Sequence, residues 1–321
     1  MGLFNRYIRP GKGIRKEDVT ENFGFRRFFA TFGDKFWRLV TLNFLFFVTN
    51  APVFGILAYL AGVGGTPYQA PVNVLHQPLY GVMLHGENPV LSALHGVVGI
   101  QVEQSYPSHW TYLCLAVGFL TLFTFGLSTV GLTYIQRNFI RREPVSTAED
   151  YFGSMKRNFK QGLVLGIFDL AVVFIIAFDL VSYFYSSQSF LLLVFMYLTV
   201  ILSAIYLLMR PYMYLICITF DLKLGKIIKN AWILAISGWK RNIFCGFFSV
   251  LVLLLNYITF VMIPSLGVGM VFIFTVSIAW FFQIYGAWPV IKKYMIDPFY
   301  EEKPVGAVAS EESQAIFEDR G

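Results

Sequence analysis

Two carboxylates, Asp169 and Asp179, fall inside one apolar stretch that is long enough to cross a membrane, residues 163–184. At the centre of a bilayer each costs about 2.5–3.5 kcal/mol, and the surrounding apolar side chains return roughly 0.3–0.6 kcal/mol each, so the stretch can still insert. The two are too far apart along a helix to share a proton or chelate one ion, at about 15 Å. Because an intramembrane ionisable residue is a functional candidate by default, Asp169 is the candidate for a relay or substrate contact. The structural alternative is that Asp169 pairs with Asn or Tyr groups of neighbouring spans, while Asp179 reaches the outer interface.

Three amides, Asn43, Asn50 and Asn256, also lie within apolar stretches. Intramembrane amides form hydrogen bonds between helices that contribute about 1 kcal/mol each, so we expect packing roles, with solute binding as the alternative. Gly162 and Gly166 form a GxxxG pattern, which allows two helices to approach closely.

Histidine and carboxylate side chains gather in one segment, residues 61–111. The four histidines are His76, His85, His95 and His109, and the carboxylates are Glu87 and Glu103. These residue types are zinc ligands, but the histidine spacings of 9, 10 and 14 match no HxxxH pair on one helical turn. We therefore expect a polar outer loop, with a weak metal site as the alternative. The three cysteines, Cys114, Cys217 and Cys245, show no CxxC spacing, and no cofactor is expected.

Motifs of the common enzyme classes do not occur in the sequence. There is no GxxxxGK[ST] loop for a nucleotide, no HExxH pair and no GxSxG nucleophile elbow, so we expect no enzymatic activity. The net charge of +6 does not indicate a nucleic-acid partner, because the Lys and Arg residues fall between apolar segments rather than on one soluble face. Phospholipid headgroups are the expected anionic partner.

The elements that position these residues follow from composition. Of 321 residues 56% are hydrophobic and 14% are charged, whereas roughly a quarter are charged in soluble domains. The apolar residues form runs of about 20, the length that crosses a bilayer as a helix. The sequence predicts an all-α membrane protein with six spans. They are residues 39–60, 112–135, 163–184, 190–209, 243–263 and 266–288, preceded by an N-terminal segment 1–38, interrupted by an outer loop 61–111 and followed by a flexible tail 289–321.

Lysine and arginine positions predict the orientation. All 25 precede the first span, follow the sixth, or lie between spans two and three or four and five. The opposite side, residues 61–111, 185–189 and 264–265, has none. Since cytoplasmic loops carry an excess of Lys and Arg, we expect both termini in the cytoplasm of a plasma-membrane protein.

One pattern recurs three times along the chain. It is FGDKFWRLVTLNFLFF from Phe32, FGSMKRNFKQGLVLGIF from Phe152 and ISGWKRNIFCGFFSVLV from Ile236. Each joins an amphipathic stretch to basic residues and a span, which predicts three tandem hairpins, each preceded by an amphipathic helix on the cytoplasmic surface. The second amphipathic helix begins with a capping-box pattern, Ser146 and Glu149. We expect lipid-headgroup contacts from Arg26, Arg27, Arg141, Arg142, Lys156, Arg157, Lys240 and Arg241.

Three longer segments carry a family resemblance. They are FWRLVTLNFLF from Phe36, GLTYIQRNFIRREPVSTAEDYFGSMKRNFKQGLVLG from Gly131 and MRPYMYLICITFDLKLGKIIKNAWILAI from Met209. They resemble the YesL family, also called domain of unknown function 624. The resemblance implies a bacterial plasma-membrane protein, typically of Gram-positive organisms and often found with carbohydrate uptake or breakdown systems, without an established activity or catalytic residues. Similar proteins connect the first two spans by a short turn, whereas residues 61–111 intervene here.

Two functions compete on this reading. The first is an accessory or assembly partner of a carbohydrate uptake system, with ABC-type sugar transporter permease subunits as the candidate partners. The alternative is a small-solute secondary transporter that uses Asp169 and the intramembrane amides. Transporters often break helices at the binding site, and Pro52 in the first span is the one residue that indicates such a break.

Overall fold

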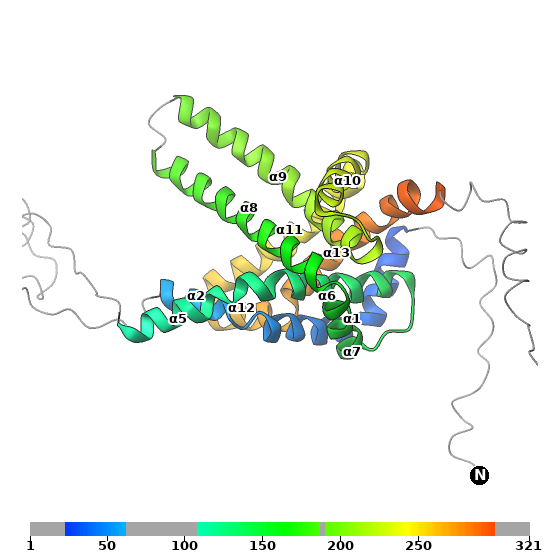
Figure 1. The fold of residues 1–321 in the computed structure, drawn as a ribbon, viewed down its shortest axis with the longest axis horizontal. Helices are drawn as coiled ribbons and strands as arrows, with labels where there is room; N and C mark the ends of the chain where they lie inside the picture. The colour runs from blue at the N-terminus through cyan, green and yellow to red at the C-terminus, as the bar shows by residue number, and fades with distance from the viewer. Residues whose placement is uncertain (1–22, 62–107, 187–189, 299–321) are drawn as a thin grey trace, which may run out of the picture.

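The computed structural model of the chain describes residues 23–61, 108–186 and 190–298, and the regular elements in these ranges are helices (Figure 1). In chain order they are α1 (Phe25–Thr49), α2 (Val53–Leu60), α5 (His109–Phe119), α6 (Thr121–Arg141), α7 (Thr147–Arg157), α8 (Phe159–Ser186), α9 (Phe190–Thr219), α10 (Leu224–Ser237), α11 (Trp239–Met262), α12 (Pro264–Met270), the π-helical η3 (Val271–Thr275), α13 (Val276–Ile291) and the π-helical η4 (Lys292–Ile296).

Five of these helical stretches in the described ranges are long and apolar enough to cross a membrane. They are His109–Arg141, Phe159–Tyr185, Phe190–Thr219, Trp239–Met262 and Pro264–Ile296, with mean hydropathies of 2.0 to 2.6. Helices α1 and α2 form a sixth span if the pair, bent by 66°, counts as one. The chain is therefore a multi-pass membrane protein whose described residues are all-helical, with five or six candidate spans.

The first span differs from the expected single helix over 39–60. Helix α1 begins at Phe25, so the predicted surface helix is its first part, and it ends at Thr49. Pro52 explains the break before α2, because its ring disfavours helical backbone at the preceding residue and it has no amide hydrogen to donate.

Two later spans are longer than expected. Helix α9 continues past residue 209 to Thr219, so Arg210, which we counted with a connecting loop, lies inside the helix. The last span continues through η4 to Ile296, so the first part of the predicted tail 289–321 is helical. Lys292 and Lys293 near the end of the last span have side chains long enough to extend toward the interface, whereas Arg210 pairs with Asp169. Residues 299–321 lie outside the described ranges.

Helices α7 and α10 occupy the places expected for the second and third amphipathic helices. The apolar face of α10, including Ile227, Ala231 and Leu234, is buried, and α10 packs against α9. Consecutive spans α8 and α9 contact each other, as do α11 and α13. The position of α7 and α10 at a lipid surface and the threefold repeat of hairpins stay predictions.

The start of α7 differs from the expected capping box. Ser146 precedes the helix, but its side chain makes no capping hydrogen bond. The backbone amide of Ser146 instead donates to Asp150 Oδ2 at 2.8 Å. The carboxylate one position after Glu149 therefore closes the turn, because it lies one full helical turn from the residue that it caps.

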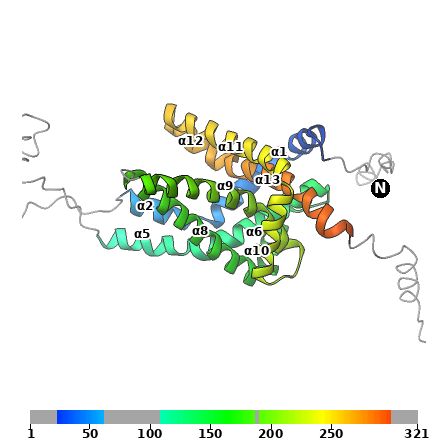
Figure 2. The ribbon, with the colours of Figure 1, turned by 90° about the horizontal axis from the view of Figure 1, so that it is seen from above.

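Helix α6 contacts α1, α8, α9 and α13. In Figure 2, α5 and α6 lie on the lower side of the bundle and α11 and α12 at its upper edge. A Cβ atom on Gly126 would overlap the backbone of Gly162 and Gly166, so the α6–α8 contact requires glycine on both helices. Likewise a Cβ on Gly131 would lie 2.7 Å from the Tyr151 ring, which packs α7 onto α6. The GxxxG pattern of the sequence thus lies in a close helix contact.

The outer halves of α8 and α9 project away from α2, α5 and α12 as a separate hairpin (Figure 1). We call the part formed by residues 171–186 and 190–203 the projecting hairpin. Its apolar side chains are mostly exposed, with Phe174 70%, Phe178 62% and Tyr197 59% accessible. A hairpin with so little protein contact depends on its root for its direction.

Candidate functional site

Asp169 lies at the root of the projecting hairpin, where it is fully buried and binds three side chains of α9. Arg210 donates from Nε to Oδ1 at 2.8 Å and to Oδ2 at 3.1 Å, and from Nη2 to Oδ2 at 2.8 Å. The hydroxyl of Tyr206 donates to Oδ1 at 2.7 Å, and that of Tyr214 to Oδ2 at 2.9 Å. The three donors are spaced by four residues, which places them on one face of α9.

Helices α6 and α13 enclose this ion pair. The Arg210 guanidinium lies 5.5 Å from the Trp280 ring and 5.9 Å from the Phe125 ring. Trp280 in turn donates from its indole nitrogen to Thr133 at 3.0 Å and packs edge to face against Tyr214. A charge in this position is stabilised by cation–π contacts as well as by the carboxylate.

This arrangement commits the carboxylate to contacts within the protein. Both oxygens of Asp169 accept bidentate hydrogen bonds from Arg210 in addition to the two tyrosines. Fork-shaped arginine–carboxylate pairs are the strong, directional ones, so the pair fixes α8 against α9. The tyrosine partners agree with the structural alternative for Asp169, and the main partner, Arg210, is one that the sequence reasoning missed. The four-residue spacing of Tyr206, Arg210 and Tyr214 would have indicated this partner, but the predicted span ended at residue 209 and so excluded Arg210 and Tyr214.

Asn43 binds the distorted turn at η3. Its Nδ2 donates to the carbonyls of Val271 and Phe272 at 2.9 and 2.6 Å, and its Oδ1 accepts from the amide of Ser277 at 2.8 Å. A π-helical turn leaves backbone groups without their usual partners, and in hydrocarbon each costs several kcal/mol. Gln136 of α6 donates to the Ser277 carbonyl at 2.8 Å. Asn43 therefore holds α1 against the η3 turn, as expected for a residue with a packing role.

The break between α1 and α2 carries a second polar cluster. Thr49 lies 2.9 Å from the Tyr151 hydroxyl and accepts from Ser128 at 2.9 Å. Asn50 donates to the Phe46 carbonyl at 2.9 Å, while its buried Oδ1 has no hydrogen-bond partner among the described residues. Burial raises the pKa of Tyr151 to about 12, so this hydroxyl stays protonated at neutral pH.

The remaining candidates do not join a common site. Asn256 donates to the Gly267 carbonyl at 3.0 Å and ties α11 to the turn into α12. Asp179 is half-buried on the projecting hairpin. His109 is exposed at the start of α5, and His76, His85 and His95 lie outside the described residues. Within the described ranges no group of three His, Cys, Asp or Glu side chains is placed to hold a metal ion.

The eight predicted headgroup-contact residues differ in burial. Arg27 and Arg241 are half-buried, whereas the others are exposed: Arg26, Arg141, Arg142, Lys156, Arg157 and Lys240. They lie at the ends of helices that meet at one side of the bundle, which we call the basic end. Arg27 of α1 donates to the Ile140 carbonyl at the end of α6, which places these ends together.

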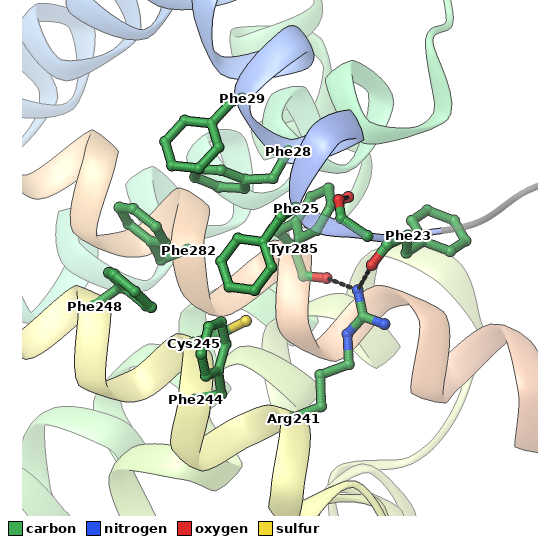
Figure 3. A pocket seen from close by; sticks show the side chains of 11 residues that line it. Phe23, Phe25, Phe28, Phe29, Arg241, Phe244, Cys245, Phe248, Phe282 and Tyr285 are labelled. Atoms are coloured by element: carbon green, nitrogen blue, oxygen red, sulfur yellow. Dashed lines mark hydrogen bonds between the residues drawn. The ribbon is translucent and has the colours of Figure 1, made fainter.

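Among the residues that the structure describes, three cavities at the basic end are large enough to consider. One of ≈170 Å³ is lined mainly by aromatic rings of α1, α11 and α13, with the Arg241 side chain at one side (Figure 3). A second of ≈660 Å³ is lined by residues of α1, α6, α13 and η4, together with the end of α9 and the residues next to it. A third of ≈650 Å³ lies at the junction of α7 and α8. The last two have the size of small-ligand sites, which are typically about 300–1,000 Å³.

Comparison with known proteins supports the resemblance seen in the sequence. Residues 108–180, from the residue before α5 to the last third of α8, match the family described as "Protein of unknown function, DUF624". Among curated proteins and solved structures there is no match. The matched range contains Asp169 and the glycines of the α6–α8 contact. The chain is thus a multi-pass membrane protein in which residues 108–180 match the DUF624 family.

Proposed function

We propose that the protein is an accessory subunit of a membrane transport system, and that it binds the membrane segment of a partner through the projecting hairpin. One observation carries this proposal: the Asp169–Arg210 pair fixes the root of a hairpin whose outer part exposes apolar side chains away from the bundle. The residue that most favoured a transporter is thereby engaged in holding two helices together.

The physics of association in a bilayer supports this use of the hairpin. Lipid tails are as apolar as leucine, so membrane helices associate through close packing rather than through a hydrophobic force. A hairpin whose direction is already set loses little conformational freedom when a partner helix packs on it, which favours binding. Phe178 of α8 and Tyr197 of α9 offer large exposed contact surfaces for such a partner.

The partner class rests on the sequence resemblance. Proteins of this family often accompany carbohydrate uptake systems, so permease subunits of an ABC-type sugar transporter are the partners that we propose. We also propose that the basic end faces the cytoplasm of a bacterial plasma membrane, because the Lys and Arg residues, apart from Arg210 within α9, belong to that side of the span prediction.

Site-specific photocrosslinking in native membranes tests the accessory role. A photoreactive phenylalanine replaces Phe178 or Tyr197 on the projecting hairpin, and Phe247 or Leu254 of α11 serves as the control. These pairs are comparably exposed, at 62% and 59% against 62% and 48%. We expect discrete protein adducts, identified by mass spectrometry, from the hairpin positions alone. Adducts to lipid only, at hairpin and control positions alike, would falsify the proposal.

A small-solute transporter is the second candidate, favoured by the broken first span. Asn50 lies at the bend with a buried Oδ1 that has no partner in the described part of the chain. Broken helices form binding sites in many transporters because the freed polar groups coordinate the solute. Purified protein in liposomes, tested with labelled mono- and disaccharides, separates the two functions. Uptake by the protein alone, lost on Asn50→Leu, favours the transporter and contradicts the accessory role.

A further inference from the structure

Two half-buried arginines at the basic end have no carboxylate partner among the residues that the structure describes. Arg27 and Arg241 both lie over the ring of Phe23, with Cζ 4.4 and 5.8 Å from its centroid. Neither forms an ion pair with any described residue, in contrast to Arg141 and Arg210. Partly buried charges without a counter-ion are costly, so this site favours an added anion.

The hydrogen bonds of these two arginines leave donors unused. Arg27 donates from Nη2 to the Ile140 carbonyl at 3.2 Å. Arg241 donates from Nη2 to the carbonyls of Phe23 and Tyr285, at 2.9 and 3.3 Å (Figure 3). The Nε atom of each is buried and has no hydrogen-bond partner within the described ranges. Each guanidinium is therefore held in place by backbone oxygens, while its Nη1 group forms no hydrogen bond with the described residues and stays available.

The ≈660 Å³ cavity adjoins Arg27 and adds further positive charge, whereas Arg241 lines the ≈170 Å³ aromatic cavity. Arg27 and Phe23 line the larger cavity, together with Arg141 and Lys292. Glu143 is the acidic residue in its wall, and it is already bound to Arg141 at 2.7 Å. Lys292 lies 4.0 Å from Asp297, which does not line the cavity. The net charge of the wall is thus positive.

The aromatic cavity adjoins the same phenylalanine. Phe23 belongs to the walls of both cavities, and the ≈170 Å³ one is lined by side chains such as Phe25, Phe248 and Phe282 (Figure 3). A basic space and an apolar space that share one wall residue fit a molecule with an anionic head and a hydrocarbon tail.

We propose that this site binds one acidic phospholipid, with its phosphate at Arg27 and Arg241 and an acyl chain in the aromatic cavity. Arginine recognises phosphate through paired N–H donors, and basic pockets between membrane helices bind anionic headgroups. The location at the ends of α1, α6, α11 and α13 matches headgroup depth, because these ends carry the charged residues of the spans. The inference concerns a lipid and does not depend on the proposed partner of the hairpin.

Titration calorimetry on delipidated protein in an uncharged detergent tests the site. Three probes are compared: dihexanoyl phosphatidic acid, glycerol 3-phosphate, which has the same phosphate without chains, and dihexanoyl phosphatidylcholine, which has the same chains without net charge. We expect the phosphatidic acid to bind at least about tenfold more tightly than either of the others. Equal binding of glycerol 3-phosphate would assign the site to a soluble anion, and equal binding of phosphatidylcholine would remove the role of charge; either result overturns the proposal.

Charge-matched variants localise the binding. R27Q/R241Q should weaken phosphatidic acid binding at least about tenfold, because both charge-assisted contacts are lost. K226Q/K229Q removes the same charge from exposed positions on α10 and should stay within about twofold of the unsubstituted protein. If R27Q/R241Q does not fold, as judged by its lipid-free melting temperature, R141Q/K292Q on the cavity wall replaces it, with the same expected loss. Unchanged binding in the folded cavity variant contradicts the assignment.

Discussion

Substitution of Asp169 by asparagine removes the negative half of the buried ion pair and leaves Arg210 without a counter-ion. The shape is kept, but the Nδ2 group of the new amide would face Arg210 Nη2, which now lies 2.8 Å from Oδ2, donor against donor. Removal of one partner from a buried pair typically costs about 3–5 kcal/mol. The Arg210 side chain is 18% exposed, so we expect a value near the lower end of this range.

The pair can be tested as a unit by a double-substitution cycle. D169N alone and R210Q alone should each lower the free energy of unfolding by about 3 kcal/mol, whereas D169N/R210Q should cost much less than their sum. The measurement is unfolding by sodium dodecyl sulfate in dodecylmaltoside micelles, followed by circular dichroism and tryptophan fluorescence. Trp280, 5.5 Å from the guanidinium, reports on the site itself.

The same cycle has a control and a refuting result. Asp179 lies on the same helix as Asp169, is half-buried, and makes no ion pair with the described residues, so D179N should change the stability by less than about 0.5 kcal/mol. If D169N costs less than about 1 kcal/mol, or if the two single effects add without coupling, the pair does not hold α8 against α9. The reasoning on the projecting hairpin would then be wrong.

Three further predictions follow from packing and protonation. Gly126→Leu should lower the free energy of unfolding by about 3 kcal/mol or more, because the leucine side chain would overlap the α8 backbone. Gly225→Leu is the control in the same unfolding assay, because no atom lies within 4 Å of a Cβ at that position. Asn43→Leu should cost about 2 kcal/mol, from three hydrogen bonds to the η3 turn at about 0.6 kcal/mol each, and equal stability of the two proteins would show that η3 does not need Asn43. Burial raises the pKa of Tyr151 from 10.0 to about 12, so the protonated hydroxyl contributes its full stabilisation below pH 10 and loses it as the pH rises toward 12. The free energy of unfolding should therefore exceed that of Tyr151→Phe by an amount that shrinks between pH 10 and 12. A constant difference between the two proteins from pH 9 to 12 would contradict the pKa shift.

The spans could be predicted from the sequence because a bilayer demands long apolar helices whatever their packing. The ends of the spans could not be predicted, because each end was set where the sequence stops being hydrophobic. A helix continues past that point when its polar side chains find partners within the protein. Arg210 is the instructive case, because the helix keeps it by pairing it with Asp169. The asparagines were recognised as packing residues, but not their partners: Asn43 binds carbonyls 228 and 229 residues away, a contact that no local pattern encodes. The sequence also contains no local pattern for the π-helical turn η3, so the backbone carbonyls that Asn43 binds could not be predicted.

Replacement of both charges by apolar residues separates a structural pair from a functional one. Buried ion pairs exchanged for hydrophobic side chains of similar size are often neutral or stabilising. D169L/R210M, made together with Y206F and Y214F so that no buried tyrosine hydroxyl loses its acceptor, should therefore fold about as well as the unsubstituted protein. If the pair serves to direct the projecting hairpin, this variant should retain the crosslinks from Phe178 and Tyr197, while D169N should lose them. If instead the charge of Asp169 moves a proton or binds a solute, the same variant should be stable but inactive in liposome uptake. A stable variant that loses its crosslinks would mean that hydrogen-bond geometry, and not simply closure of the α8–α9 root, sets the direction of the hairpin.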